Sequence, residues 1–225
     1  MKIYDETSHD EIFDPDLTKG YLYDGTMITG YTEETTEVME GTVTEERPEG
    51  LVRLIPSRPI VEECQYYHTY TDGEVEEIRN TKIDELLAAQ DAAIAAGTDI
   101  LLSDGSTKHF NYADKDQADV SDMFNAVSIG MAFYIYHADS DSCEVYSAKD
   151  IIIIYSTLSS LKTAQKTYCN QLCMYVKTLA TVPEIKAVTY GQELAGRYLE
   201  KYNELVEISK AEMQSAIEKL SATSG

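Results

Sequence analysis

The chain has 225 residues, which is enough for one large domain or two small ones. Its 40 acidic and 18 basic residues give a net charge of −22. This balance argues against nucleic-acid binding and against docking on an anionic membrane, because both need a basic surface. The polar N-terminus and a longest apolar run of five residues (151–155) predict neither a signal peptide nor a membrane span. Four cysteines in a chain of this size predict reduced thiols and synthesis in a cytoplasm.

Residues 1–72 are the most acidic part of the chain, with 17 Asp or Glu against 5 Lys or Arg. Turn signals recur at Asp14-Pro15-Asp16, Asp24-Gly25, Glu40-Gly41 and Pro48-Glu49-Gly50, and Pro56 and Pro59 mark the end. Short strand-like pieces lie between them at 21–23, 27–31, 42–44 and 51–55. These pieces hold few large aliphatic side chains. We therefore expect an acidic, strand-rich attachment arm that docks onto a larger assembly.

An aromatic cluster of Tyr66, Tyr67 and Tyr70 follows the arm's prolines. Tyrosine rings offer flat apolar faces with a polar tip, so these three are candidate partner-docking residues. The alternative is that they pack against the helix that follows.

That helix is marked by Thr71 and Glu74, which have the spacing of a capping box, and we expect it to connect residues 73–97 and to stop at Gly97. A small α+β module is expected at 98–148. Its strands are predicted at 99–103, 108–112, 132–138 and 143–146, and its helix opens at 114–117 with a looser capping box.

The stretch ILLSDGSTKHF (100–110) contains the residue types of a phosphate-binding loop but lacks its spacing. Asp104-Gly105 instead predicts a hairpin turn. Cys169 and Cys173 share one helix face, which is typical of small core side chains and could be half of a metal site. His109 and His137 could face each other across a sheet, and an acidic group could recruit a cation; its members are Asp114, Asp116, Asp119, Asp139 and Asp141. None of these patterns carries a catalytic constellation, so we expect no enzyme activity, no cofactor and no bound metal.

The C-terminal stem, residues 149–225, carries the strongest periodicity, and its helices are predicted to open at Ser147 and Thr181. Apolar residues recur at steps of three and four, with Gln165 and Ser209 as polar steps, which is a heptad pattern. The seam residues are Ile151, Ile154, Leu158, Leu161, Gln165, Tyr168, Leu172, Tyr175 and Leu179, then Leu199, Tyr202, Val206, Ser209, Met213, Ala216 and Leu220. The two seams pair either within one chain, as a helical hairpin, or between chains, as a coiled-coil bundle.

Five segments together resemble a known family. They read DILLSDGSTKHFNYADKDQAD (99–119), YIYHAD (134–139), YSAKDI (146–151), KTYCNQL (166–172) and YGQEL (190–194). This pattern is similar to a family of domains of unknown function found in the C-terminal parts of tailed-phage and prophage tail proteins. The N-terminal segment, with Asp14-Pro15-Asp16-Leu17 and Tyr66-Tyr67-His68, resembles the arms of small phage proteins. The resemblance implies a virion or tail-assembly role, and it carries over no catalytic residue.

The expected fold is therefore α+β: a hairpin-rich N-terminal arm, a small α+β module and long C-terminal helices. The expected function is a structural component of a phage tail, associated with the baseplate or a tail fibre and made in the bacterial host cytoplasm. Its expected partners are other tail proteins and further copies of itself, a trimer in preference. Two alternatives stay open, namely a host receptor-binding module that contacts surface glycans and a tail-fibre assembly chaperone absent from the mature virion.

Overall fold

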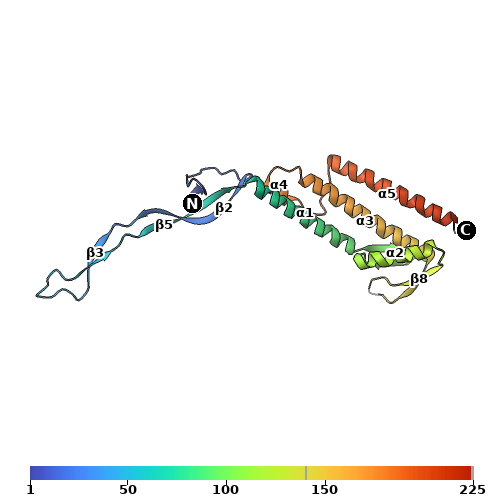
Figure 1. The fold of residues 1–225 in the computed structure, drawn as a ribbon, viewed down its shortest axis with the longest axis horizontal. Helices are drawn as coiled ribbons and strands as arrows, with labels where there is room; N and C mark the ends of the chain where they lie inside the picture. Colours follow the sequence, from blue (N-terminus) through green and yellow to red (C-terminus); the bar gives the residue numbers. More distant parts are fainter. Residues whose placement is uncertain (140, 224–225) are drawn as a thin grey trace. The chain divides into compact units, whose positions relative to one another are not determined.

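The computed structural model describes residues 1–139 and 141–223, with side chains up to residue 219 and without residue 140. The fold is mixed α+β, and the described residues form five helices and four small sheets (Figure 1). The chain divides into two units, Met1–Val75 and Glu76–Gly225. Each unit is described separately below.

The first unit is built around a long two-stranded ribbon. Strands β2 (Gly20–Tyr31) and β5 (Pro59–Thr69) pair antiparallel from Gly20 opposite Thr69 to Tyr31 opposite Pro59, with an irregularity between Ile28 and Gly30. Strand β1 (Ile3–Asp5) pairs parallel with β5. Strands β3 (Thr35–Val38) and β4 (Val52–Ile55) form a separate antiparallel pair between β2 and β5 in the chain. We call residues 20–69 the ribbon and residues 35–55 the tip hairpin.

Three sequence predictions about this unit are wrong. Asp24-Gly25 is not a turn but lies inside β2, where the Tyr66 ring occupies the space that a side chain at Gly25 would need. Residues 42–44 form no strand, only an isolated bridge at Thr44. Pro59 does not end the extended structure; it begins β5, a position where a strand does not need the missing amide hydrogen.

The second unit follows a strand, strand, helix, strand, strand, helix order, as expected from the sequence. Its elements are α1 (Asp72–Ala95, whose first turn belongs to the first unit), β6 (Thr98–Leu101), β7 (Thr107–Phe110), α2 (Asp114–Ser128), β8 (Phe133–Tyr136), β9 (Glu144–Ser147), α3 (Ala148–Val176), α4 (Val182–Ala187) and α5 (Gly196–Thr223). Side chains from β6, β7, α2, β9 and α3 share one apolar core, whose fully buried members include Phe110, Met123 and Ile154. Burial of this apolar surface stabilises the unit.

The predicted helix starts agree with the hydrogen bonds at three of four places. Thr71 and Glu74 bond reciprocally, Asp150 N–H donates to Ser147 Oγ at 3.2 Å, and Thr181 with Glu184 forms a second reciprocal box. At α2 the prediction is wrong by one residue. The N-cap is Ala113, whose backbone N–H donates to the Asp116 carboxylate at 3.0 Å while its own side chain accepts nothing.

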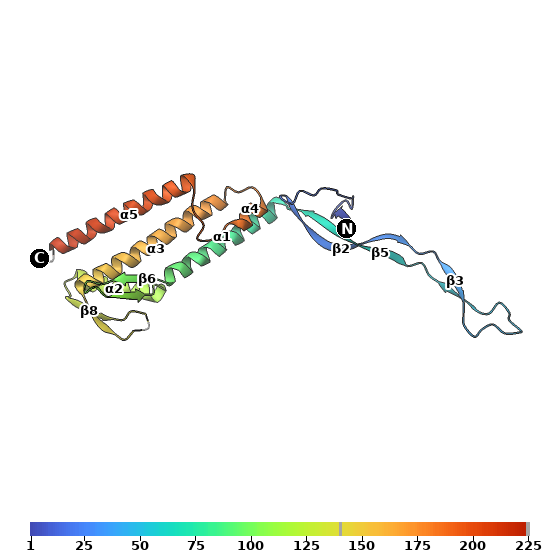
Figure 2. The same cartoon turned by 180° about the vertical axis from the view of Figure 1, so that it is seen from behind.

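The helix predicted from Thr181 is much shorter than a stem helix. Helix α4 ends at Ala187 because Val188 turns to an extended conformation, and glycines with positive φ follow at Gly191 and Gly196. Helix α5 then lies alongside α3 (Figures 1 and 2). The C-terminal part is therefore a long helix, a short helix and a second long helix.

Candidate functional site

The first half of the predicted seam on α3 is buried inside the second unit. Ile151, Ile154 and Leu158 are fully buried in the apolar core, and Leu161 packs against that core. These four side chains contact strands and helices of their own unit. A surface for another copy of the chain would have to lie elsewhere on α3.

The middle of the seam contacts the loop after α4. The Tyr190 hydroxyl donates to Gln165 Oε1 at 2.6 Å, and the Tyr168 hydroxyl donates to the Gln192 carbonyl at 2.7 Å. The Tyr168 ring also lies 6.3 Å from the ring of Tyr202 on α5. Burial raises the pKa of the Tyr168 and Tyr190 hydroxyls, so both remain neutral donors at neutral pH.

The end of the α3 seam alternates between interior and surface. Leu172 is fully buried, while Tyr175 is half-buried with its ring 5.6 Å from that of Tyr198 on α5. Leu179 is half-buried just after α3, and its carbonyl accepts a hydrogen bond from Arg79 on α1 at 2.9 Å. Contacts within the chain thus engage both Tyr168 and Tyr175.

On α5 none of the predicted seam residues whose side chains are described is fully buried. Tyr202, Val206, Ser209 and Met213 are half-buried, whereas Ala216 is exposed. Leu199 is also exposed, to 40%, and Ile208, on the opposite face of the helix, is 54% exposed. The side chain of Leu220 lies outside the described residues.

The stretch 100–110 forms a hairpin and not a phosphate-binding loop. Gly105 has a positive φ of 88°, and the Asp104 carboxylate accepts hydrogen bonds from the Ser106 amide and hydroxyl. Lys108 bonds to Glu144 at 2.8 Å and lies 3.5 Å from Asp141, and these carboxylates raise its pKa to about 12. The only lysine of the stretch is thus engaged with carboxylates of its own unit.

The cysteine pair on α3 is buried and protonated. The Sγ atoms of Cys169 and Cys173 are 3.9 Å apart, and Cys169 Sγ lies 3.4 Å from the Leu86 carbonyl of α1. Burial raises the pKa of both thiols, that of Cys169 to about 12. Because a metal ligand or nucleophile must be the thiolate, this arrangement favours packing over chemistry.

The predicted histidine pair and the acidic group do not assemble into a site. His109 bonds to Asp99 at 2.7 Å and to the Ala96 carbonyl at 2.8 Å, and the ring of His137 stacks on Tyr136. In the part of the chain that the structure describes, no three His, Cys, Asp or Glu side chains converge closely enough to hold a metal ion. None of the described helices is long and apolar enough to span a membrane.

The three candidate docking tyrosines lie in the first unit but differ in exposure. Tyr67 is buried, and its hydroxyl donates to the Asp16 carbonyl at 2.7 Å. Tyr66 and Tyr70 are half-buried. They belong to a row of rings on one face of the sheet whose neighbouring centroids lie 5.1–6.5 Å apart, made of Tyr4, His9, Tyr21, Tyr23, Tyr66, His68 and Tyr70. This row was not predicted from the sequence, because no strand was predicted at Pro59–Thr69.

His68 is the most strongly connected polar group of the first unit. Its Nδ1 faces the Glu6 carboxylate, and its Nε2 lies 2.9 Å from Glu74 Oε1 in the first turn of α1. Carboxylates only accept hydrogen bonds, so both contacts are satisfied together only by the imidazolium. Accordingly, the hydrogen bonds to Glu6 and Glu74 raise the pKa of His68. Hydrogen bonds from the Thr71 backbone N–H and then from His68 lower the pKa of Glu74 to about 2.

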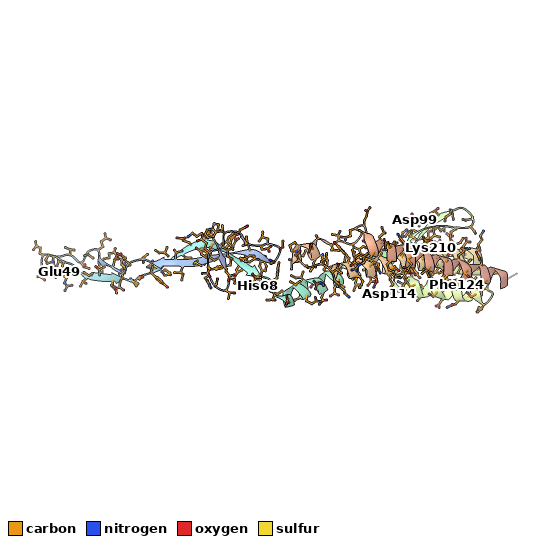
Figure 3. All side chains as sticks on the ribbon, turned by 90° about the horizontal axis from the view of Figure 1, so that it is seen from above. Glu49, His68, Asp99, Asp114, Phe124 and Lys210 are labelled. Carbon is orange, nitrogen blue, oxygen red and sulfur yellow. The ribbon has the colours of Figure 1, made fainter. Side chains whose placement is uncertain are left out.

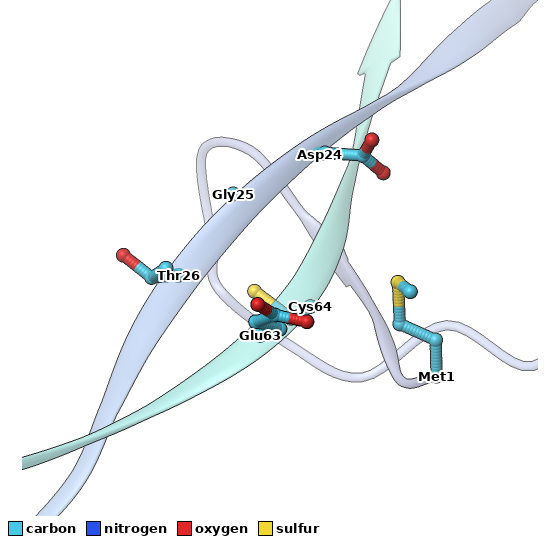
Figure 4. A pocket seen from close by; sticks show the side chains of 6 residues that line it. All are labelled: Met1, Asp24, Gly25, Thr26, Glu63 and Cys64. Carbon is cyan, nitrogen blue, oxygen red and sulfur yellow. The ribbon is translucent and has the colours of Figure 1, made fainter.

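Two hollows on the ribbon share Met1, Glu63 and Cys64, and one of them also includes Lys2. One of about 380 Å³ is lined by Met1, Asp24, Gly25, Thr26, Glu63 and Cys64 (Figure 4). It combines two carboxylates with a buried thiol, and it contains neither a histidine base nor a cationic side chain.

What distinguishes the first unit is how few of its apolar side chains are buried. Many large apolar side chains of the ribbon are at least one-third exposed: Tyr21, Tyr23, Ile28, Tyr31, Val38, Met39, Val43, Leu51, Val52, Leu54, Ile60 and Val61. Among residues 1–75, all of which the structure describes, only Cys64 and Tyr67 are buried apolar side chains. A surface of this kind is typical of a protein–protein contact.

Comparisons of the chain with protein-family models, with curated proteins and with solved structures find no match.

Proposed function

We propose that the chain is a structural component of a bacteriophage tail, associated with the baseplate or a tail fibre. Its first unit is the attachment arm, and its C-terminal helices hold copies of the chain together. The sequence resemblance described above supports the tail assignment. The exposed apolar ribbon supports the attachment role.

One observation carries the proposal: the first unit exposes many large apolar side chains and buries only Cys64 and Tyr67. A two-stranded ribbon is marginal in water unless a third strand or another layer covers it. Here β1 covers β5 only from Gln65 to Tyr67, which leaves most of the ribbon without a neighbouring strand in the described residues. An assembly that covers the ribbon would supply the missing burial.

The proposed contact between copies involves α5. Tyr202 and Met213 are half-buried, whereas Ile208 is 54% exposed on another face of the same helix. The heptad spacing serves the helical hairpin within the chain, and Ile208 is the exposed apolar side chain that we assign to the contact with other copies.

Electron microscopy of purified particles tests the proposal, using gold-labelled antiserum raised against the chain. Label at the tail is the expected result. A chain that is abundant in infected-cell lysate but absent from particles would contradict a virion role and favour the assembly-chaperone alternative. Pre-immune serum and particles made without the gene are the controls.

The receptor-binding alternative draws on the exposed rings of Tyr21 and Tyr23, which are 42% and 36% exposed. Aromatic faces can stack on sugar rings. A glycan array probed with the whole chain separates the alternatives, because an attachment protein should bind no glycan there. Loss of an array signal in Tyr21→Ala, with Tyr31→Ala as the exposed control, would support receptor binding.

A further inference from the structure

We propose that one face of the tip hairpin, formed by Val38, Val52 and Leu54, is the docking face for a protein partner whose apolar surface is bordered by lysine or arginine. This inference rests on the proposed function and names the surface and the partner chemistry of its attachment.

The register of the tip hairpin separates its two faces. Val38 lies opposite Val52, and Thr36 lies opposite Leu54. Because side chains alternate along a strand, these four residues share one face. The other face carries Thr35 opposite the half-buried Ile55, and Glu37 opposite Arg53, which are joined by an ion pair of 3.1 Å. The hairpin is therefore amphipathic, with one apolar and one polar face.

Apart from the loop at Gly50, which lies close to Val38, the first unit places little on the apolar face. Val38, Val52 and Leu54 are 49%, 56% and 55% exposed. The aliphatic face of an amphipathic sheet normally packs on a core. Here no helix or second sheet of the first unit covers that face. We infer that another molecule covers the apolar face that the alternating side chains of β3 and β4 create.

The negative charge of the tip hairpin and its flanks indicates which kind of partner can dock there. Residues 33–58 carry seven glutamates and three arginines, and one of these arginines is paired with Glu37. A second copy of the same hairpin would bring like charges together, which costs free energy where the surfaces are desolvated. Nucleic acids and anionic membranes are disfavoured for the same reason. A protein surface with an apolar centre and a basic border complements the hairpin on both counts.

Free strand edges add a second mode of contact. Strands β3 and β4 pair only with each other in the described residues, so each presents one unpaired edge. Such edges accept a strand from a partner, with backbone hydrogen bonds giving affinity and alternate side chains giving selectivity. Glu49 lies in the loop between these strands, at the end of the ribbon opposite His68 (Figure 3).

Site-specific photocrosslinking in infected cells tests the inference in the full-length chain. Benzoylphenylalanine replaces Leu54 on the apolar face or Thr35 on the polar face of the same hairpin. The expected result is an adduct from position 54, at least about fivefold more abundant than from position 35, in which the partner peptide is apolar and flanked by Lys or Arg. An adduct with a second copy of this chain, equal yields from both positions, or no adduct from either would overturn the inference.

The identity of the partner separates this inference from the proposed function. A tail protein as partner supports both. A partner that is absent from purified particles sustains the docking face and contradicts the tail assignment. Label at the tail combined with no adduct from position 54 sustains the tail assignment and overturns the docking face.

A charge variant tests the basic border. Three changes in the loop of the tip hairpin, E45Q, E46Q and E49Q, should lower the yield of the position-54 adduct several-fold. The matched control removes the same number of charges from the second unit, E193Q, E200Q and E212Q, and should leave the yield unchanged. Equal yields for both triple variants would overturn the electrostatic part of the inference.

Discussion

The two units of the chain use apolar residues in opposite ways. In the second unit, Val120, Met123 and Ile154 are fully buried together with strand residues of the same module. In the first unit, side chains of similar size such as Val52, Leu54 and Val61 are more than half exposed. The second unit carries its own core, whereas the first presents the apolar side chains of a sheet to a molecule outside the chain.

The difference teaches that composition alone does not separate a core from an interface. Both units hold apolar residues at strand or helix spacing, and the distinction arises from topology. Helix α3 lies across two hairpins and α2, so one helix covers several elements. The ribbon has only β1 as a third strand and no helix over most of its length.

Truncating one aliphatic side chain in each unit should give the largest contrast. Ile154→Ala removes a fully buried side chain and should destabilise the second unit by about 2–5 kcal/mol. Leu54→Ala removes a side chain that is 55% exposed and should change stability by less than about 0.5 kcal/mol. Urea unfolding followed by circular dichroism of the full-length variants measures both. Equal losses would contradict the contrast.

Two glycines with positive φ provide a second test. At Gly97 (φ 65°) a Cβ atom would lie 1.8 Å from the Phe110 carbonyl oxygen. This oxygen belongs to the backbone of β7, which cannot shift as easily as a side chain. At Gly50 (φ 68°) it would lie 2.7 Å from a side-chain methyl of Val38, which can move. Gly97→Ala should therefore cost roughly 3 kcal/mol or more, and Gly50→Ala roughly 1–2 kcal/mol.

Gly105→Ala is the matched control for that pair. Gly105 also has a positive φ, of 88°, but nothing lies within 4 Å of its added Cβ. Its cost should therefore reflect backbone conformation alone, about 1–2 kcal/mol. A Gly97→Ala variant no less stable than Gly105→Ala would contradict the packing of α1 against the β7 end.

The first unit should loosen when the pH rises through the raised pKa of His68. The pKa of His68 is raised above 6.5, so the stability it contributes is fully present below pH 6.5 and is lost as the pH rises through its folded value. Glu74, with its pKa lowered from 4.5 to about 2, contributes stability above pH 4.5 that is lost on acidification toward pH 2. The contact between these two residues should be strongest at pH 4.5–6.5.

Nuclear magnetic resonance of the His68 ring and of the Glu6 and Glu74 side chains, followed over pH, measures this contact. His68→Gln should remove the loosening above pH 6.5, because an amide has no proton to lose in this range. His109→Gln in the second unit is the matched control and should leave the titration of Glu6 and Glu74 unchanged. A His68 pKa at or below 6.5 would contradict the double carboxylate contact.

Thiol labelling rates should give the smallest but simplest contrast. Cys143 is exposed and should react at once with a disulfide reagent. Cys64 is buried only by the strands of the first unit, while Cys169 and Cys173 lie under the helices of the second. In a Cys143→Ser background, Cys64 should therefore react before the α3 pair. The reverse order would contradict the claim that the first unit opens more easily.

Local signals in the sequence predicted much of the second unit. Asp104-Gly105 identifies its hairpin, and Thr71, Ser147 and Thr181 identify helix starts, because each of these signals acts on residues two or three positions away. Ala113 gave no such signal, since alanine has no capping atom. The end of the helix at Ala187 was not predicted, because the heptad pattern resumes at α5.

The first unit could not be predicted to the same extent. Gly25 and Pro59 are ordinary turn signals, yet both lie in strands of the ribbon. Tyr66 over Gly25 and Tyr67 over Gly20 show the reason: cross-strand pairs between residues about 40 apart override the local preference. The candidate docking residues shifted accordingly, from the buried Tyr67 to the exposed Val52 and Leu54.

Hydrogen exchange of the free, full-length chain, read by mass spectrometry, tests the central claim most directly. The amides of β3 and β4 should exchange within seconds to minutes, because an uncovered hairpin opens easily. The amides of α3 around Ile154 and Leu158 should stay protected until the second unit unfolds. Exchange in β3 and β4 as slow as in α3 would show that the tip hairpin is stable without a partner and would contradict the account.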